Sequence, residues 1–267
     1  MAEKTLQAQM DAAKAYEGLM VPALFGEWAS TVADAAQIKP GERVLDVACG
    51  TGILAREVLS RTGAAEFVTG LDPSAGMLEV AKDLAPGVEW RQGVAESLPF
   101  PDASFDVVVS QFGLMFFNDR SEALRQALRV LRPGGRMAFA VWDSLKNIPA
   151  YADEVALLER LAGVLAADAL RAPFVLGDRR DLETLFAGAG VEAVEIATRK
   201  GSARFPSVRV MVEADLRGWL PVMGVVLTEE QIVGILQAAE LALSQYVTGD
   251  GAAYFGTSAH VVTGTKA

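Results

Sequence analysis

The chain has 267 residues, a formal net charge of −10 at pH 7 and a hydrophobic share of 51%. The length allows one sizeable buried core, and the apolar share excludes a disordered chain. The acidic balance argues against a nucleic-acid-binding protein, because a surface that binds phosphates needs clustered lysine and arginine.

Residues 1–37 are predicted to form one or two helices. Apolar and aromatic residues recur there at helical spacing, and Pro22 is expected to break or kink the run. These residues are Tyr16, Leu19, Met20, Leu24 and Trp28. The polar start, Met1 to Gln9, lacks the apolar region of a signal peptide, and no apolar run reaches transmembrane length. We therefore expect a cytoplasmic protein without membrane insertion.

Residues 38–142 alternate between strand and helix patterns. Strands are predicted at 43–48, 67–71, 88–92, 105–110 and 136–142, and helices at 53–61, 75–84 and 121–131. The last of these helices is expected to end at the turn Arg132-Pro133-Gly134-Gly135. This alternation is typical of an α/β fold, in which a parallel sheet has crossover helices on both faces.

The pattern changes after Trp142. Helices are predicted at 153–170, 178–187, 208–220 and 228–246, and strands at 191–204 and 253–265. Asp178 and Thr228 are the expected N-caps of two of these helices. We expect a single domain in which the segments 145–177 and 207–250 are helical insertions that cap the carboxyl edge of the sheet. Residues 251–267 supply the last of seven strands.

A glycine turn follows the first predicted strand. The sequence Asp46-Val47-Ala48-Cys49-Gly50-Thr51-Gly52 leads from that strand into the next helix. Such a turn lets backbone N–H groups and a helix N-terminus approach a polar ligand closely. Asp72 ends the second strand, where a carboxylate can accept hydrogen bonds from both hydroxyls of a ribose. Asp72 could instead cap the following helix, although Ser74 serves equally well.

Five short motifs give this region a family resemblance. They are Asp46–Gly52, Gly70–Ser74 with Met77-Leu78, Ala95–Phe100, Ser104–Val108 and Leu131–Gly135. In this order they resemble the class I S-adenosylmethionine-dependent methyltransferases, in the small-molecule branch of ubiquinone and menaquinone biosynthesis. The resemblance covers about residues 40–142 and implies a Rossmann-like, seven-stranded, mostly parallel sheet with an N-terminal helical lid.

The resemblance also implies a set of residues around S-adenosylmethionine. Gly50 and Gly52 would face its methionine end, Asp46 would order the turn, Asp72 would bind the ribose, and Met77 would pack on the adenine. The complete set is Tyr16, Phe25, Asp46, Ala48, Cys49, Gly50, Gly52, Leu54, Asp72, Pro73, Met77, Val94, Ala95, Ser110 and Gln111. Tyr16, Phe25 and Met77 are equally compatible with a purely structural role in the core.

One position departs from the family pattern. Val94 stands where the family often has an acidic residue that accepts from the adenine amino group. Glu96 or a backbone carbonyl would then have to accept this hydrogen bond. The backbone N–H of Ala95 can still bind an adenine ring nitrogen.

The predicted function is methyl transfer to a small, partly apolar molecule by in-line displacement. A nicotinamide-dependent oxidoreductase is the main alternative, because Gly50–Ala55 satisfies G-x-G-x-x-A and Asp72 lies 20 residues after Gly52. A cofactor-binding protein without catalysis is a third possibility. The sequence identifies no particular catalytic residue, and we expect catalysis to rest on positioning. His260, the only histidine, is expected to be structural, with Tyr16 and Asp143 as competing candidates for a base. One cysteine and one histidine give no reason to expect a metal site.

Overall fold

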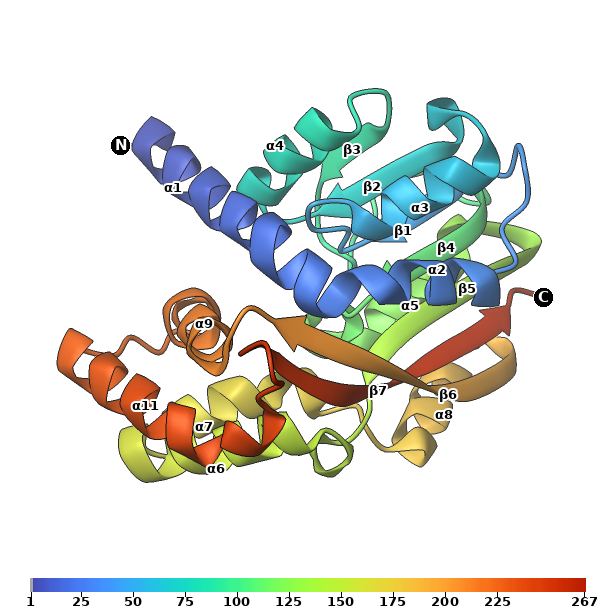
Figure 1. The fold of residues 1–267 in the computed structure, drawn as a ribbon. Helices are drawn as coiled ribbons and strands as arrows, with labels where there is room; N and C mark the ends of the chain where they lie inside the picture. Colours follow the sequence, from blue (N-terminus) through green and yellow to red (C-terminus); the bar gives the residue numbers. More distant parts are fainter. Residues whose placement is uncertain (1) are drawn as a thin grey trace. The chain divides into compact units, whose positions relative to one another are not determined.

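The computed structural model describes residues 2–267, with side chains described from Leu6 onward. The chain divides into two compact units (Figure 1). Unit 1 comprises Met1–Val141, Asp178–Arg199 and His260–Ala267, and unit 2 comprises Trp142–Gly177 and Lys200–Ala259. Both units are therefore built from segments that lie far apart in the sequence.

Seven strands form one sheet in the order β3-β2-β1-β4-β5-β7-β6. Their bounds are β1 Val44–Val47, β2 Val68–Asp72, β3 Glu89–Gln92, β4 Phe105–Gln111, β5 Leu131–Trp142, β6 Glu192–Phe205 and β7 Ala253–Thr265. The first five strands pair in parallel. The carboxyl ends of β1, β2 and β4 therefore meet at one edge, where open α/β sheets bind their ligands.

The last strand, β7, runs against its neighbour β5. Backbone hydrogen bonds join Gly134 and Gly135 to Lys266, and Asp143 to Ser258. The partner number falls as β5 advances, so β7 is antiparallel to β5. The predicted seven-stranded, mostly parallel α/β sheet is confirmed.

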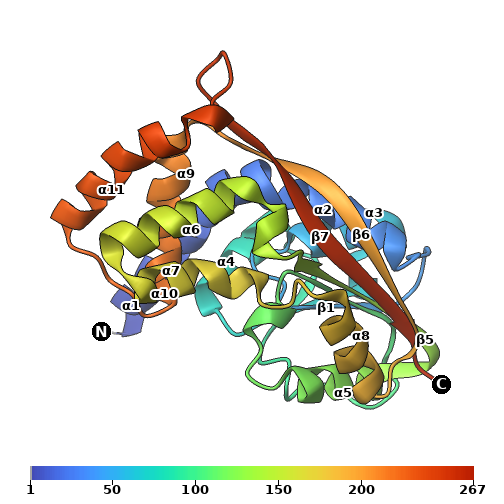
Figure 2. The same ribbon diagram turned by 90° about the horizontal axis from the view of Figure 1, so that it is seen from below.

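Four helices of unit 1 begin and end within one residue of their predicted bounds. They are α3 Ile53–Thr62, α4 Ala75–Leu84, α5 Arg120–Val130 and α8 Arg179–Gly188. Ser74 caps α4 by accepting from the Met77 amide, and Asp178 caps α8 by accepting from the Arg180 amide. Figure 2 shows α5 and α8 side by side, in agreement with their contacts.

Helices also make up most of unit 2. They are α6 Pro149–Ala162, α7 Val164–Arg171, α9 Val208–Ala214, the π-helix η6 Asp215–Trp219, α10 Leu220–Val222 and α11 Glu229–Ala242. α6 packs against α7 and α11, and α9 packs against α11. Thr228 forms a capping box with Gln231 at the start of α11, as its sequence position predicts. Whether these helices cap the carboxyl edge of the sheet stays a prediction.

The N-terminal segment is continuously helical. It runs through α1 (Ala2–Ala15), the π-helix η1 (Tyr16–Phe25) and α2 (Gly26–Ala35). Pro22 lies inside η1 and does not break the helix. Proline cannot donate to the α-helical ladder, and the wider π-helical turn accommodates it. In Figure 1 the segment passes from α4 towards the first strands of unit 1.

Two other element predictions were wrong in detail. The helix predicted at 153–170 is interrupted at Gly163, whose backbone (φ 87°, ψ 174°) cannot belong to an α-helix. The turn predicted at Arg132–Gly135 lies within β5. There Phe105 pairs with Leu131 and Val107 already pairs with Arg136, so the extra residues bulge out of the register.

Among residues 2–267, no helix combines the length and the apolar character that crossing a bilayer requires.

Candidate functional site

The glycine turn has the left-handed backbone that its sequence suggests. Gly50 has φ +55° and Gly52 has φ +84°, the latter at the start of α3. The Cys49 amide donates to Leu71 O at 3.0 Å, and the Gly52 amide donates to Cys49 O at 2.8 Å. The turn is thus fixed to β2 and closed on itself at the carboxyl end of β1.

Asp72 connects this turn to the next strand. Its Oδ2 accepts from the Gly50 amide at 2.9 Å, and its Oδ1 accepts from the Ser74 amide at 2.8 Å. Burial raises the pKa of Asp72, while these two backbone amides oppose the rise. Each carboxylate oxygen keeps a further lone pair, so Asp72 can still accept from a ligand hydroxyl.

Unpartnered acceptor atoms gather at the ends of β1 and β4. Asp46 is buried, and neither of its carboxylate oxygens makes a hydrogen bond of normal geometry with the described residues. The same holds for Ser110 Oγ and Gln111 Oε1. β1 and β4 are neighbours with Asp46 paired to Val109, so these groups lie at one point of the edge.

Acidic side chains gather at this edge, and burial favours their protonated forms. The pKa of Asp46 is raised well above its usual value, first by burial and then by the charge of Asp72, against the effect of the Ala55 amide. Burial, followed by the charges of Asp46 and Asp72, also raises the pKa of the Cys49 thiol. Unpaired buried acceptors are costly, and a cationic donor bound here would satisfy them.

Three features force the backbone close together at this edge. Ala48 (φ +59°) and Phe112 (φ +56°) are left-handed although neither is glycine. Gly113 must be glycine, because a Cβ there would lie 2.6 Å from the Ala48 Cβ and 3.0 Å from Ser110 Oγ. Such conformations persist only where the surroundings enforce them, and they cluster at functional sites.

Aromatic side chains of the N-terminal segment join the same region. The Tyr16 and Phe25 rings stack with their centroids 5.4 Å apart. The centroids of the Phe25 and Phe112 rings are 5.7 Å apart. The pKa of Tyr16 is raised, first by burial of the hydroxyl and then by the charges of Glu17 and Asp72. Gln111 Nε2 donates to Phe25 O at 2.9 Å. Tyr16 and Phe25 are therefore brought close to the residues predicted around the cofactor.

The remaining predicted residues lie around this centre. Leu54 is buried in the first turn of α3, the Met77 amide donates to Ser74 Oγ, and Pro73 O accepts from Gln92. Ala95 is buried, whereas Val94 is 45% exposed. Glu96, the suggested acceptor for the adenine amino group, already accepts from the Asn118 and Asp119 amides. Within the described residues, no hydrogen bond joins Met77, Val94 or Ala95 to the turn, so their shared role stays a prediction.

Trp90 supports the glycine turn and was missed in the sequence. A Cβ at Gly52 would lie 2.5 Å from Trp90 Cη2, and one at Gly70 would lie 2.3 Å from Trp90 Cζ3. The indole of β3 thus passes over Gly70 of β2 to lie against the start of α3. The pattern that could have identified Trp90 is a large ring opposite two glycines. This pattern can be recognised only when the order of the strands is known.

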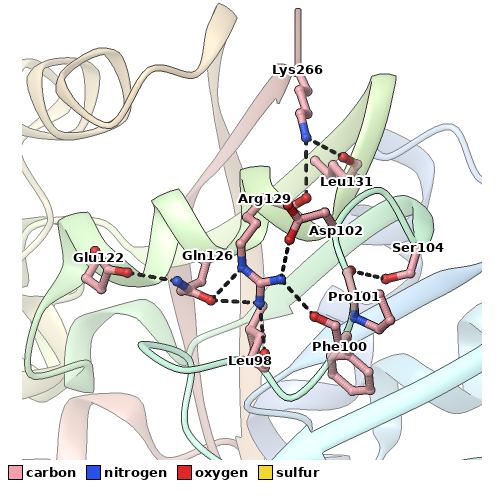
Figure 3. Close-up of polar contacts among 10 residues, drawn as sticks. All are labelled: Leu98, Phe100, Pro101, Asp102, Ser104, Glu122, Gln126, Arg129, Leu131 and Lys266. Atoms are coloured by element: carbon pink, nitrogen blue, oxygen red, sulfur yellow. Dashed lines mark hydrogen bonds and ion pairs between the residues drawn. The ribbon is translucent and has the colours of Figure 1, made fainter.

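Arg129 is the second residue that sequence reasoning missed (Figure 3). Its guanidinium donates to Leu98 O, Phe100 O and Asp102 Oδ1, each at 2.8 Å, and also to Gln126 Oε1. Lys266 Nζ donates to the carbonyls of Arg129 and Leu131. A residue at the end of α5 thereby holds the loop that contains the Ala95–Phe100 motif.

The two other candidates for a base have structural partners. His260 is buried, and its Nδ1 lies 2.9 Å from Thr198 Oγ1. Asp143 accepts from Ser144 N and Asn147 Nδ2 through Oδ1, and from Ser258 Oγ through Oδ2. Within the described residues no three metal-ligating side chains form a cluster.

The comparisons with known proteins define the class. The family model described as a methyltransferase domain matches residues 45–139. A ubiquinone/menaquinone biosynthesis C-methyltransferase of Xanthomonas oryzae is 44% identical over 115 residues, which cover 41% of this chain and 46% of the relative. The chain thus spans about half the length of such curated relatives.

A relative with longer coverage extends the match. The ubiquinone/menaquinone biosynthesis C-methyltransferase of Idiomarina loihiensis is 31% identical over 192 residues, covering 65% of this chain and 76% of the relative. A solved methyltransferase structure from an antibiotic biosynthesis pathway of Anabaena variabilis has a TM-score of 0.66 at 17% identity, covering 90% and 97% of the two chains. This last likeness supports the fold alone.

The chain belongs to the class I S-adenosylmethionine-dependent methyltransferases of the ubiquinone/menaquinone biosynthesis type. The cofactor of this family is S-adenosylmethionine. The matches favour the methyltransferase interpretation over the nicotinamide-dependent oxidoreductase, whose glycine pattern this chain also satisfies.

Proposed function

We propose that this protein transfers a methyl group from S-adenosylmethionine to a small, partly apolar molecule. The observation that carries the proposal is the set of buried acceptor atoms on Asp46, Ser110 and Gln111 beside the glycine turn. S-Adenosylmethionine has an ammonium and a sulfonium group, and its ammonium donates hydrogen bonds. An acidic edge with unpartnered acceptor atoms fits a ligand with a donating ammonium group better than it fits an anionic dinucleotide.

In this proposal, different residues of unit 1 bind different parts of the ligand. Asp72 accepts from the ribose hydroxyls, and Gly50 and Gly52 let the backbone approach the methionine moiety. Tyr16 and Phe25 exclude water from one side. When bound, the cofactor supplies a methyl group made electrophilic by its sulfonium, so the protein needs mainly to align the acceptor and exclude water.

The names of the relatives support one class of acceptor as the first to test. Their names describe C-methylation in quinone biosynthesis, which makes a hydroxylated aromatic ring the first acceptor to test. The acidic charge of the chain is consistent with an acceptor that is not a nucleic acid. The expected cytoplasmic location stays a prediction that cell fractionation would check.

Titration calorimetry tests the cofactor directly. We expect S-adenosylmethionine and S-adenosylhomocysteine to bind in the micromolar range or tighter, and NAD to show no heat of binding under the same conditions. Binding of NAD without binding of either sulfur ligand would contradict the proposal. Incubation with methyl-labelled S-adenosylmethionine and a panel of quinols, phenols and amines would then identify the acceptor by mass spectrometry.

A further inference from the structure

Glu17 links the N-terminal segment to the glycine turn. Its Oε2 accepts from Thr51 Oγ1 at 2.5 Å, and its Oε1 accepts from Arg56 Nη2 at 2.6 Å. Arg56 Nη1 in turn donates to Thr51 O at 2.7 Å. Glu17, Thr51 and Arg56 therefore form a closed ring of hydrogen bonds between η1, the turn and α3.

This ring fixes the peptide group at the centre of the turn. The Thr51 carbonyl accepts from Arg56, while the N–H of the same peptide, on Gly52, donates to Cys49 O at 2.8 Å. The Thr51 hydroxyl is held as well. With both ends of the peptide and the adjoining side chain engaged, the left-handed backbone at Gly50 and Gly52 has little freedom to relax.

The ion pair is sheltered rather than fully solvated. The side chains of Arg56 and Glu17 are 23% and 21% exposed. Charge-assisted hydrogen bonds in such a setting are stronger than those of exposed pairs. Arg56 alone could not hold η1, because Glu17 supplies the acceptor oxygens on that side.

Other contacts hold the same segment against the elements of the site. A Cβ at Gly76 of α4 would lie 2.5 Å from the Gln9 carbonyl carbon, so α1 touches α4 closely. Gln111 at the end of β4 donates to Phe25 O. Asp34 of α2 accepts from Arg61 of α3 at 2.6 Å. Of these anchors, the ring at Glu17 is the one that involves the glycine turn.

We propose that Glu17 is a positioning residue for the cofactor. Through Thr51 and Arg56 it holds the glycine turn in its binding conformation, and it holds Tyr16, its neighbour in η1, beside Asp72. The inference rests on the proposed function, since it concerns the same cofactor. In this inference Glu17 acts through Thr51 and Arg56, to which its two carboxylate oxygens are bonded, and not through direct contact with the ligand.

The test compares Glu17→Gln with a matched control, Asp34→Asn. Asp34 also joins the N-terminal segment to α3, but away from the turn. S-Adenosylhomocysteine affinity is measured by calorimetry, the melting temperature by scanning calorimetry, and backbone protection at residues 48–52 by hydrogen exchange. We expect Glu17→Gln to weaken S-adenosylhomocysteine binding about 10-fold to 100-fold and to reduce protection of the turn. Asp34→Asn should leave the S-adenosylhomocysteine affinity and the protection of the turn within about twofold of the wild type.

A double-mutant cycle separates positioning from general stability. Thr51→Val removes the same hydrogen bond from the other side and serves if Glu17→Gln does not fold. The double variant Glu17→Gln, Thr51→Val should bind S-adenosylhomocysteine no more weakly than the weaker-binding single variant. The two losses in binding affinity are then not additive, which shows that the two residues are coupled. Coupling in the melting temperature without coupling in affinity would overturn the inference, as would equal losses in Asp34→Asn and Glu17→Gln or unchanged affinity in Glu17→Gln. If the wild type binds no S-adenosylhomocysteine, the proposed function fails and this inference fails with it.

Discussion

Asp72 shows how one residue can serve both the fold and the ligand. It receives the amides of Gly50 and Ser74, which join the glycine turn to the start of α4. These bonds use one lone pair on each oxygen and set the orientation of the carboxylate. In the proposed function, the remaining lone pairs of Asp72 are directed before the ribose arrives, which would reduce the entropy lost on binding.

The change Asp72→Asn should therefore weaken cofactor binding more than it weakens the fold. The amide NH2 of asparagine would face a backbone N–H of Gly50 or Ser74, and one acceptor for the ribose would be lost. We expect S-adenosylhomocysteine affinity to fall about 10-fold to 100-fold by calorimetry. Glu79→Gln, on the exposed face of α4, is the control. Affinity within twofold of the wild type would remove Asp72 from the ribose site.

His260 illustrates the opposite case, a titratable side chain with a structural role. It is buried and bonded to Thr198 between β7 and β6. We expect His260→Ala to lower the melting temperature, because the Thr198 hydroxyl loses its partner, while S-adenosylhomocysteine affinity stays within about twofold. Once an acceptor is known, turnover should also be largely retained. A fall in turnover of 10²-fold to 10⁴-fold at unchanged cofactor affinity would instead identify His260 as a general base.

At the level of elements, α5 organises a loop through one guanidinium. Arg129 binds two backbone carbonyls and Asp102, which ties the loop from Leu98 to Asp102 to the end of the helix. Lysine can donate to only part of this set, because it lacks the planar fork of arginine. The loop follows Val94 and Ala95, so its order bears on the predicted adenine site.

The change Arg129→Lys should loosen that loop without altering the rest of unit 1. We expect the free energy of unfolding to fall by about 1.5–3 kcal/mol, the range for hydrogen bonds to charged groups. Hydrogen exchange should speed up at residues 94–102 and stay unchanged in β1. Arg125→Lys is a suitable control, since Arg125 forms an ion pair with the neighbouring Glu122 on the exposed face of α5 and has no bond to the Leu98–Asp102 loop among the described residues. Equal protection in both variants would show that the loop does not depend on Arg129.

The elements could be predicted where their signals are local. The glycine turn, the caps Ser74, Asp178 and Thr228, and β7 follow from neighbouring residues, whose propensities act over a few positions. The ring at Glu17 joins residues 34 and 39 positions apart, and Trp90 meets Gly52 across β2. Such contacts depend on strand order and helix docking, so nothing in the local sequence marks them. Gly163 was missed for a related reason, because single glycines often remain inside helices.

At the scale of the whole molecule, buried acids make stability depend on pH. Asp46 and Asp72 in unit 1, and Glu154 and Asp215 in unit 2, all have raised pKa values, chiefly because of burial. For Glu154 the charge of Asp215 adds to the effect, and neither of its oxygens has a partner among the described residues. These carboxyl groups bind a proton more tightly in the folded protein than in the unfolded chain.

The sign of the pH dependence follows from this. The stabilisation of the folded state by such groups is fully present below their pKa in the unfolded chain, about 4. It is lost as the pH rises through their raised pKa in the folded protein. The free energy of unfolding, measured with urea in the absence of ligand, should therefore fall as the pH rises from about 4 through about 7, the raised pKa of Asp215. Glu154→Gln should flatten this slope and gain stability relative to the wild type as the pH rises. A slope identical to that of the wild type would mean that Glu154 does not contribute.

The place of β7 in the sheet has a consequence for biosynthesis. This strand lies between β5 and β6, yet it is translated after both of them. The hydrogen-bonding edge of β5 therefore stays unsatisfied on the ribosome while more than a hundred further residues are made, and unit 1 receives its closing segment, His260–Ala267, last. An open apolar strand edge is a template for mispairing, and long-range pairing is slow. The nascent chain should consequently be most vulnerable to aggregation along β5, in the interval before β7 emerges.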